Sequence, residues 1–210
     1  MMTTGAAPRH HARATRETGR RTRSALLDAA ARLFGERGLA GVSLAGIAAA
    51  ADAFPSQITY YFGSKEALFV EAASREMLHA AARVEEAGRR AGSPSDYVRA
   101  MAGRALDGSA LLLFADALLL CRHRPELRPL VARTVDRLHR EGSRALAERC
   151  ARDGWELSAA PEVVARAFWA VLLGLVMEAA GAGAPLDPAA AEAAVLGALG
   201  TRPSHTDWRP

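Results

Sequence analysis

Four helix start and stop signals fall close together in the first third of the chain. Ser43 is a typical helix N-cap, and Pro55 suits a first helical turn, where its missing N–H has no partner to lose. Gly63 is typical of a helix end, and Ser64 can cap the helix that follows. The pattern predicts two short helices joined by a tight turn, one running from Ser43 to about 51 and the other from Pro55 to 62.

Longer helices are predicted on both sides of this pair. Apolar residues recur at helical spacing from about Thr22 until Gly38, and a second long helix runs from Lys65 to about Arg90. The first stripe is Leu26, Leu27, Ala30, Leu33 and Phe34, and the stripe of the first short helix is Leu44, Ile47, Ala48 and Ala51. Further helices are expected over about 94–107, 109–123, 125–153, 161–182 and 188–199.

Composition agrees with an all-α fold. Half of the residues are hydrophobic, alanine dominates, and β-branched clusters are scarce. The segment most like a membrane span, 163–184, contains Arg166 and Glu178, so we expect a packed helix there. We expect no signal peptide, no disulfide between Cys121 and Cys150, and a cytoplasmic protein.

Positive charge is concentrated at the N-terminus. The first 23 residues hold six arginines against Glu17, a net charge of +5, while the whole chain has +4. Such an arm suits a polyanion, either nucleic acid or an anionic membrane surface. A disordered tail without a partner explains the charge equally well at this point.

The second short helix has two unlike faces. On a wheel of 100° per residue, Phe54, Ile58 and Phe62 fall on one side, which we expect to pack on the preceding helices. Ser56 and Tyr60 lie opposite. Gln57 and Thr59 flank them, and Tyr61 lies nearer the apolar edge. Hydroxyls and an amide without a carboxylate are what a helix needs to enter the major groove, so the pair describes a helix-turn-helix.

Lys65 is the single lysine among 27 basic residues. It is predicted at the N-terminus of a helix, where free backbone N–H groups and the helix dipole already favour an anion. An ordinary solvated lysine is the alternative. Beside the polar helix face, we interpret Lys65 as a partner for a DNA phosphate.

Residues 24–69 resemble the N-terminal domain of TetR-type (tetracycline-repressor-like) transcriptional regulators. The matching pieces are "LLDAAARLFGERG", "VSLAGIAAAA" and "ITYYFGSKEALF", in the family's order and spacing. The resemblance implies an all-α homodimer in which three helices bind DNA, a fourth links the domains, and the rest form a ligand-binding and dimerising body. The expected parts are a disordered basic arm (1–19), a DNA-binding domain (20–80), a helical body (81–200) and a loose tail (201–210).

The chain departs from the family pattern in the turn before the second short helix. Asp52 replaces a glycine and Phe54 replaces a capping serine, while Thr59 and Tyr61 stand where tyrosine and often histidine are usual. The predicted DNA-contacting residues are Arg20, Arg21, Arg23, Ser43, Pro55, Ser56, Gln57, Thr59, Tyr60, Tyr61 and Lys65.

The segment 111–121 is apolar all round except for Asp116, which predicts a buried helix with a buried carboxylate. A salt bridge to one of the arginines is favoured over a role in a ligand cavity. Placement by helix order gives a candidate effector pocket of Phe114, Asp116, Leu118, His123 and Trp169.

An apolar stripe on the helix that starts near Pro161 is the candidate dimer contact. By the resemblance, this helix and 188–199 pack against their two-fold mates, although an internal core helix would show the same stripe. The stripe is Val164, Phe168, Val171, Leu172 and Leu175.

The resulting prediction is a ligand-responsive DNA-binding regulator that acts as a repressor on a near-palindromic operator, with an unknown small-molecule effector. The alternative is a helical interaction module that does not bind DNA. The sequence has no nucleophile–base pairing, phosphate loop or metal-ligand spacing, so we expect no enzyme, cofactor, metal or membrane partner.

Overall fold

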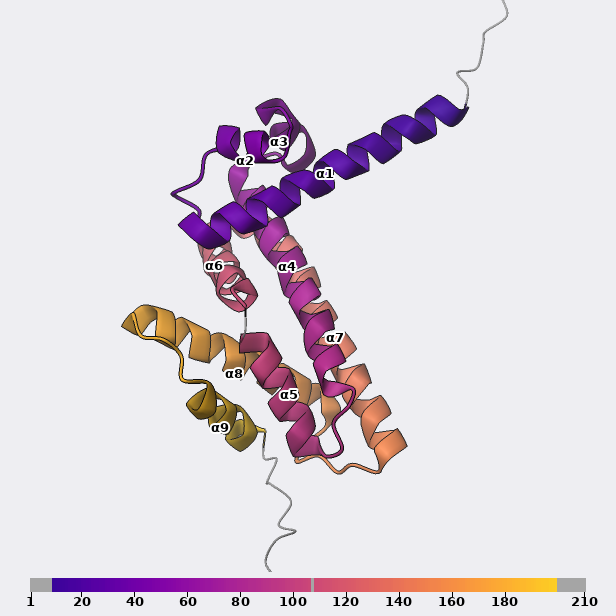
Figure 1. Cartoon of the computed structure of the whole chain (residues 1–210), viewed down its shortest axis with the longest axis vertical. Helices are drawn as coiled ribbons and strands as arrows, with labels where there is room; N and C mark the ends of the chain where they lie inside the picture. Colours follow the sequence, from indigo (N-terminus) through magenta and orange to yellow (C-terminus); the bar gives the residue numbers. More distant parts are fainter. Residues whose placement is uncertain (1–8, 107, 200–210) are drawn as a thin grey trace, which may run out of the picture. The chain divides into compact units, whose positions relative to one another are not determined.

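The computed structural model describes residues 9–106 and 108–199, with side chains from Glu17 onward, and these residues form helices without any strand (Figure 1). In chain order they are α1 (Arg9–Arg37), α2 (Leu44–Ala50), α3 (Pro55–Phe62), α4 (Lys65–Gly88), α5 (Pro94–Leu106), α6 (Ala110–His123), the 3-10 turn η1 (Pro125–Leu127), α7 (Arg128–Asp153), α8 (Pro161–Ala182) and α9 (Pro188–Ala198). From α2 onward the predicted helices are confirmed to within a few residues.

The chain divides into two compact units, 1–72 and 73–210. The division falls inside α4, at 72/73 rather than at the predicted 80/81. The predicted tail, 201–210, lies outside the described residues.

The core of the first unit joins α1, α2, α3 and the start of α4. Leu26, Ile47 and Ile58 are fully buried, one from each of the first three helices. Phe34 meets Phe69 of α4 edge to face, with ring centroids 5.1 Å apart. The apolar stripe predicted for α1 is confirmed as core, so its packing fixes where α2 and α3 sit.

The local end signals act as predicted. The Ser43 hydroxyl oxygen accepts from the Gly46 N–H at 3.0 Å, and the Ser64 hydroxyl oxygen accepts from the Ala67 N–H at the same distance. Gly38 and Gly63 end α1 and α3 with positive φ angles of 66° and 78°. Glycine carries no Cβ to oppose that conformation, so each helix stops there.

The start of α1 corrects the prediction of a disordered arm over 1–19 for residues 9–19, while residues 1–8 lie outside the described residues. The helix begins at Arg9, well before the expected Thr22. Alanines at 12 and 14 favour helix, and Glu17 pairs with Arg21 one turn later, Oε1 to Nε at 3.3 Å. The prediction relied on apolar periodicity, which the sequence before Thr22 lacks.

The second unit packs α8 against α5, α6, α7 and α9. Phe114 and Leu172 are fully buried at its centre. Only one face of α8 is covered: 28% of its most apolar window is buried, although α8 has the length and composition of a membrane span. Val163 and Met177 are exposed on the other face.

The prediction that α6 is buried all round is wrong for one face. Leu112, Asp116 and Leu119 recur at helical spacing and are all exposed in this chain. Asp116 makes no ion pair within the described residues, so the favoured salt bridge is not observed. An apolar sequence shows that a helix has apolar faces and does not show which partner covers each of them.

Candidate nucleic-acid interface and ligand cavity

The outer face of α3 is polar and free of acidic groups. Ser56, Thr59 and Tyr60 are exposed, with Tyr60 at 82%, while Ile58 on the opposite side is fully buried. The wheel predicted this division. The face therefore offers hydroxyl donors and acceptors on a helix that is anchored by one core residue.

Phe54 was predicted on the buried apolar face of this helix, and that prediction is wrong. Its side chain is 74% exposed, because the residue is the N-cap and has an extended backbone, with φ −97° and ψ 145°. A helical wheel does not apply to a residue outside the helix. Phe54 therefore adds an aromatic ring to the exposed surface at the start of α3, and the N-cap position was the signal that could have shown it.

Gln57 supplies the cap that Phe54 lacks. Its side-chain oxygen accepts from the Phe54 backbone N–H at 2.9 Å. Gln57 is half-buried, and its side-chain nitrogen is still able to donate. We therefore expect Gln57 to donate to an acceptor atom of a base. Gln57 therefore stabilises the first turn of α3 through this hydrogen bond and is also partly exposed at the surface.

The turn between α2 and α3 has a helix-end geometry that usually needs glycine. The Ala53 N–H donates to the Ala48 carbonyl at 2.9 Å, and the Asp52 N–H donates to Ala49 at 3.3 Å. This is a Schellman pair of bonds, and it places Asp52 at φ 48°. Aspartate tolerates this region better than most residues, so the turn forms without the family's glycine.

Tyr61 and Phe62 lie inward of the polar face. Tyr61 is half-buried between Tyr60 and Phe62, with ring centroids at 5.0 and 6.2 Å. A Cβ added at Gly19 would lie 3.3 Å from the Tyr61 hydroxyl oxygen. Phe62 was predicted as core and is half-buried.

The predicted phosphate-binding arginines are not equivalent. Arg23 forms an ion pair with Glu71, and its guanidinium lies 4.9 Å from the centre of the Phe62 ring. Arg20 and Arg21 are exposed, and each forms an ion pair with Glu17. Arg23 therefore joins α1 to α3 and α4, whereas Arg20 and Arg21 are available to a partner. Lys65 is half-buried at the first position of α4, and Ser43 and Pro55 are exposed.

The second unit contains a cavity of about 100 Å³ that is partly open to solvent. Its wall is largely apolar and comes from α4, α5, α7 and α8, with Leu199 after α9. Its aromatic members are Tyr97, Phe168 and Trp169. Glu85, Arg137 and Glu141 are its charged members, and Arg137 Nε lies 2.8 Å from Glu141 Oε1.

Of the predicted pocket residues, only Trp169 lines this cavity. Phe114 is core, Leu118 is half-buried, and Asp116 and His123 are exposed. Burial raises the pKa of the Asp116 carboxyl nonetheless. The order of helices along the chain does not say which face of α6 points inward, so it did not identify the residues that line this cavity.

The predicted dimer stripe is also largely internal. Val164 and Phe168 line the cavity and Leu172 is fully buried, while Val171 and Leu175 are half-buried. The exposed face of α8 lies beside this stripe. It carries Val163, Ala170, Gly174 and Met177.

Tyr97 was missed by sequence reasoning and is the polar group most enclosed by the cavity. It is 3% exposed and meets Trp155 edge to face at 5.6 Å. Burial raises the pKa of its hydroxyl, and the nearby Glu85 carboxylate raises it further. Tyr97 also borders a second, polar cavity whose wall includes Arg89, Arg149 and Arg152.

Arg149 holds the segment after α4 in place. Its two terminal nitrogens donate to the carbonyls of Ala91 at 2.6 Å and Arg89 at 3.3 Å. The guanidinium lies over the Trp155 ring at 4.3 Å and over the Tyr97 ring at 5.4 Å. These contacts fix one end of both cavities.

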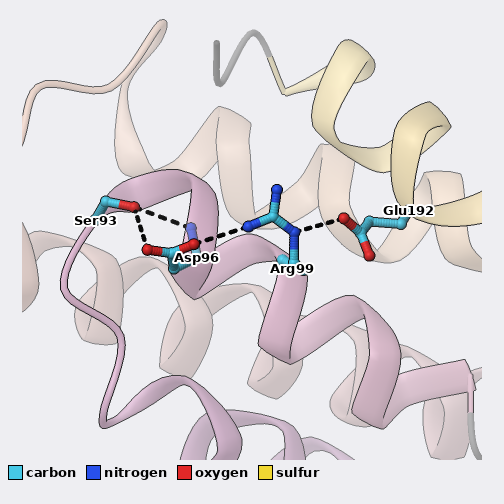
Figure 2. A network of polar contacts seen from close by, with 4 residues as sticks. All are labelled: Ser93, Asp96, Arg99 and Glu192. Carbon is cyan, nitrogen blue, oxygen red and sulfur yellow. Dashed lines mark hydrogen bonds and ion pairs between the residues drawn. The ribbon is translucent and has the colours of Figure 1, made fainter. Parts of the chain in front are cut away.

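A polar chain links α5 to α9 (Figure 2). Arg99 Nη1 lies 2.8 Å from Asp96 Oδ1, and Arg99 Nε donates to Glu192 Oε1 at 2.5 Å. Ser93 donates to Asp96 Oδ2 at 2.8 Å. The hydrogen bond to Glu192 raises the pKa of Arg99. The chain fixes α9 beside α5.

Comparison with family profiles gives two matches. Residues 26–72 match the profile described as bacterial regulatory proteins, tetR family, and residues 94–197 match that of the bacterial transcriptional repressor C-terminal domain. The comparison with curated proteins found no match.

Solved structures are similar over most of the chain. A structure described as a transcriptional regulator from Rhodococcus sp. RHA1 is 38% identical, with a TM-score of 0.76, covering 86% of this chain and 95% of that one. The multidrug binding protein EbrR complexed with ethidium is 28% identical, with a TM-score of 0.60, covering 85% and 98%. A TetR-family regulator from Mesorhizobium loti is 19% identical, with a TM-score of 0.68 over 87% and 95%, and shows the fold alone.

Proposed function

The chain belongs to the TetR family of bacterial transcriptional regulators, and on this premise we propose that it is a ligand-released repressor that binds a near-palindromic operator as a homodimer. The observation that carries the proposal is the polar, acid-free face of α3, supported on a buried Ile58. It favours this function over an interaction module without DNA binding.

DNA contacts divide into two classes under this proposal. Ser56, Gln57, Thr59 and Tyr60 face base edges in the major groove, where hydroxyl and amide groups can discriminate. The phosphate partners are Arg20, Arg21, Lys65, Ser43 and Tyr61. Pro55 has no N–H to donate to a phosphate, so its part is to fix the backbone of the first turn of α3. Arg23 acts through its contacts with Glu71 and Phe62, because those partners already occupy its guanidinium.

The effector site is assigned to the cavity that Tyr97 and Trp169 border. Its aromatic and aliphatic wall suits a mainly apolar small molecule with an acceptor for the Tyr97 hydroxyl. The binding of ethidium by the related EbrR supports a small-molecule site in a fold of this kind.

The dimer contact is assigned to the exposed face of α8 rather than to the buried stripe. Val163, Ala170, Gly174 and Met177 recur at the spacing of a packed helix seam, and their small members permit close approach. A dimer also binds two half-sites. One recognition helix contacts only a few base pairs, so a second half-site is needed for specificity. We place the protein in the cytoplasm, where its DNA is.

Selection from a random duplex library tests the proposal. The enriched sequence should be a two-fold repeat. Sedimentation of the free protein should give twice the 22.2 kDa chain mass, and sedimentation of the complex should show two chains bound to each operator. Aromatic small molecules that quench Trp169 fluorescence should release the complex. Failure to enrich any sequence at physiological salt would contradict the proposed function.

A further inference from the structure

The arginines of the first turns of α1 share one face of the helix. Arg9, Arg13, Arg16 and Arg20 are spaced four, three and four residues apart. At 3.6 residues per turn their positions fall within ~60° of one another. We call these four positions the arginine stripe, and Glu17 is the only acidic residue in the first 27.

The stripe lies on a helix that continues beyond the core. Among the described side chains, which begin at Glu17, the first fully buried one on α1 is Leu26, and several turns of the helix precede it. Figure 1 shows them extending past α2 and α3. Like charges one turn apart destabilise a free helix by roughly 0.2–0.5 kcal/mol per pair, so this spacing favours a partner that supplies negative charge.

The helix that carries the stripe also meets α3, the proposed recognition helix. Gly19 brings α1 next to Tyr61 of α3, and the stripe lies roughly 90° round the helix from Gly19. From Arg9 to Arg20 the helix rises about 16 Å, equal to the axial rise of about five base pairs. A row of arginine positions of this length along one helix face matches the length of a row of phosphates along one strand.

We propose that the first turns of α1 form a second DNA-binding surface, which lies along the phosphate backbone outside the half-site read by α3. The inference rests on the proposed function and extends it, since the partner is double-stranded DNA flanking the operator. The contacts are sequence-blind, so they lengthen the footprint and steepen the salt dependence without changing the operator sequence.

The test compares two triple variants with equal change in charge. Arg9→Gln/Arg13→Gln/Arg16→Gln removes most of the stripe. Arg133→Gln/Arg140→Gln/Arg144→Gln removes three exposed arginines of α7 and is the matched control. Binding is measured by fluorescence anisotropy against salt on two duplexes: the selected operator alone, and the same operator with ten added base pairs on each side.

On the long duplex the stripe variant should bind more weakly, and its salt slope should fall by about 0.9 for each lost phosphate contact, while the control keeps the wild-type slope. On the short duplex the stripe variant should match the wild type. The corresponding triple lysine variant should keep the wild-type slope on both. Equal thermal melting of all variants is expected, because the stripe changes precede the buried residues of α1 and the control changes are at exposed positions of α7.

Equal salt slopes for the stripe variant and the wild type on the long duplex would overturn the inference while leaving the proposed function intact. So would loss of binding to vesicles of anionic phospholipid without any change on DNA, since the stripe would then serve a membrane. Absence of wild-type binding to either duplex would overturn both.

Discussion

Gly88 of α4 and Tyr97 of α5 pack in direct contact: a Cβ added at residue 88 would lie 2.5 Å from Cε2 and 2.7 Å from Cδ2 of the Tyr97 ring. The same ring lines the proposed effector cavity and is backed by Arg149. Movement of this ring on ligand binding would therefore press on the end of α4, the helix that begins at the DNA-binding unit with Lys65.

Gly88→Ala should destabilise the protein despite the better helix propensity of alanine. Propensity favours the change by up to about 1 kcal/mol, but overpacking of a ring held by Arg149 costs about 1–3 kcal/mol. Thermal unfolding measures the balance. Gly103→Ala is the matched control, since nothing lies within 4 Å of its Cβ position, and it should stabilise by up to about 1 kcal/mol. If Gly88→Ala and Gly103→Ala both stabilised the protein, the Tyr97 ring would have to move aside at little energetic cost.

Asp52→Gly should stabilise the first unit. Asp52 has φ 48°, a region in which a side chain costs roughly 1 kcal/mol and glycine nothing. Asp52→Ala should lower stability, because alanine tolerates the left-handed region less well than aspartate does. Chemical denaturation of the three proteins gives the order. A glycine variant less stable than the wild type would contradict the Schellman geometry of this turn.

Asp116→Asn should raise stability at neutral pH and leave DNA binding unchanged. Burial raises the pKa of this carboxyl, so its ionised form is disfavoured in the folded chain. Its contribution to stability is therefore full below the unfolded pKa of Asp and is lost as pH rises through the folded pKa. The gain from asparagine should vanish in acid. Urea denaturation at pH 7 and pH 3 measures it, and an equal gain at both would exclude ionisation as the cause.

Local chemistry explains which features the sequence predicted. Ser43, Pro55, Gly63 and Ser64 set helix ends through bonds within a few residues of themselves, and all four ends were found where expected. The polar face of α3 followed from the wheel, because that face lies opposite Ile58, which is buried.

Features that depend on packing between distant helices were not predictable. Which face of α6 or α8 points inward depends on partners far along the chain, so Asp116 was placed in a pocket and Phe168 at a dimer contact. Phe54 failed for a different reason, as the residue before a helix does not follow the helical period. The sequence did not mark Tyr97 as a cavity residue, since a single aromatic near the start of a helix is common.

The central claim is that the outer face of α3 reads base edges, and Tyr60 tests it most directly. Gln57 is less suitable, because it also caps the helix through the Phe54 N–H. Tyr60 is exposed, and its one described ring contact is Tyr61. Lys65→Ala provides the contrast, because a phosphate contact is lost on any DNA and the salt slope falls by about one.

The decisive measurement is the affinity of Tyr60→Ala for the selected operator and for a random duplex of equal length, at one salt concentration. The account predicts that the operator is bound more weakly by roughly 1–3 kcal/mol while binding to the random duplex is unchanged. Equal weakening on both duplexes, or no change on either, would contradict the assignment of α3 as the recognition helix.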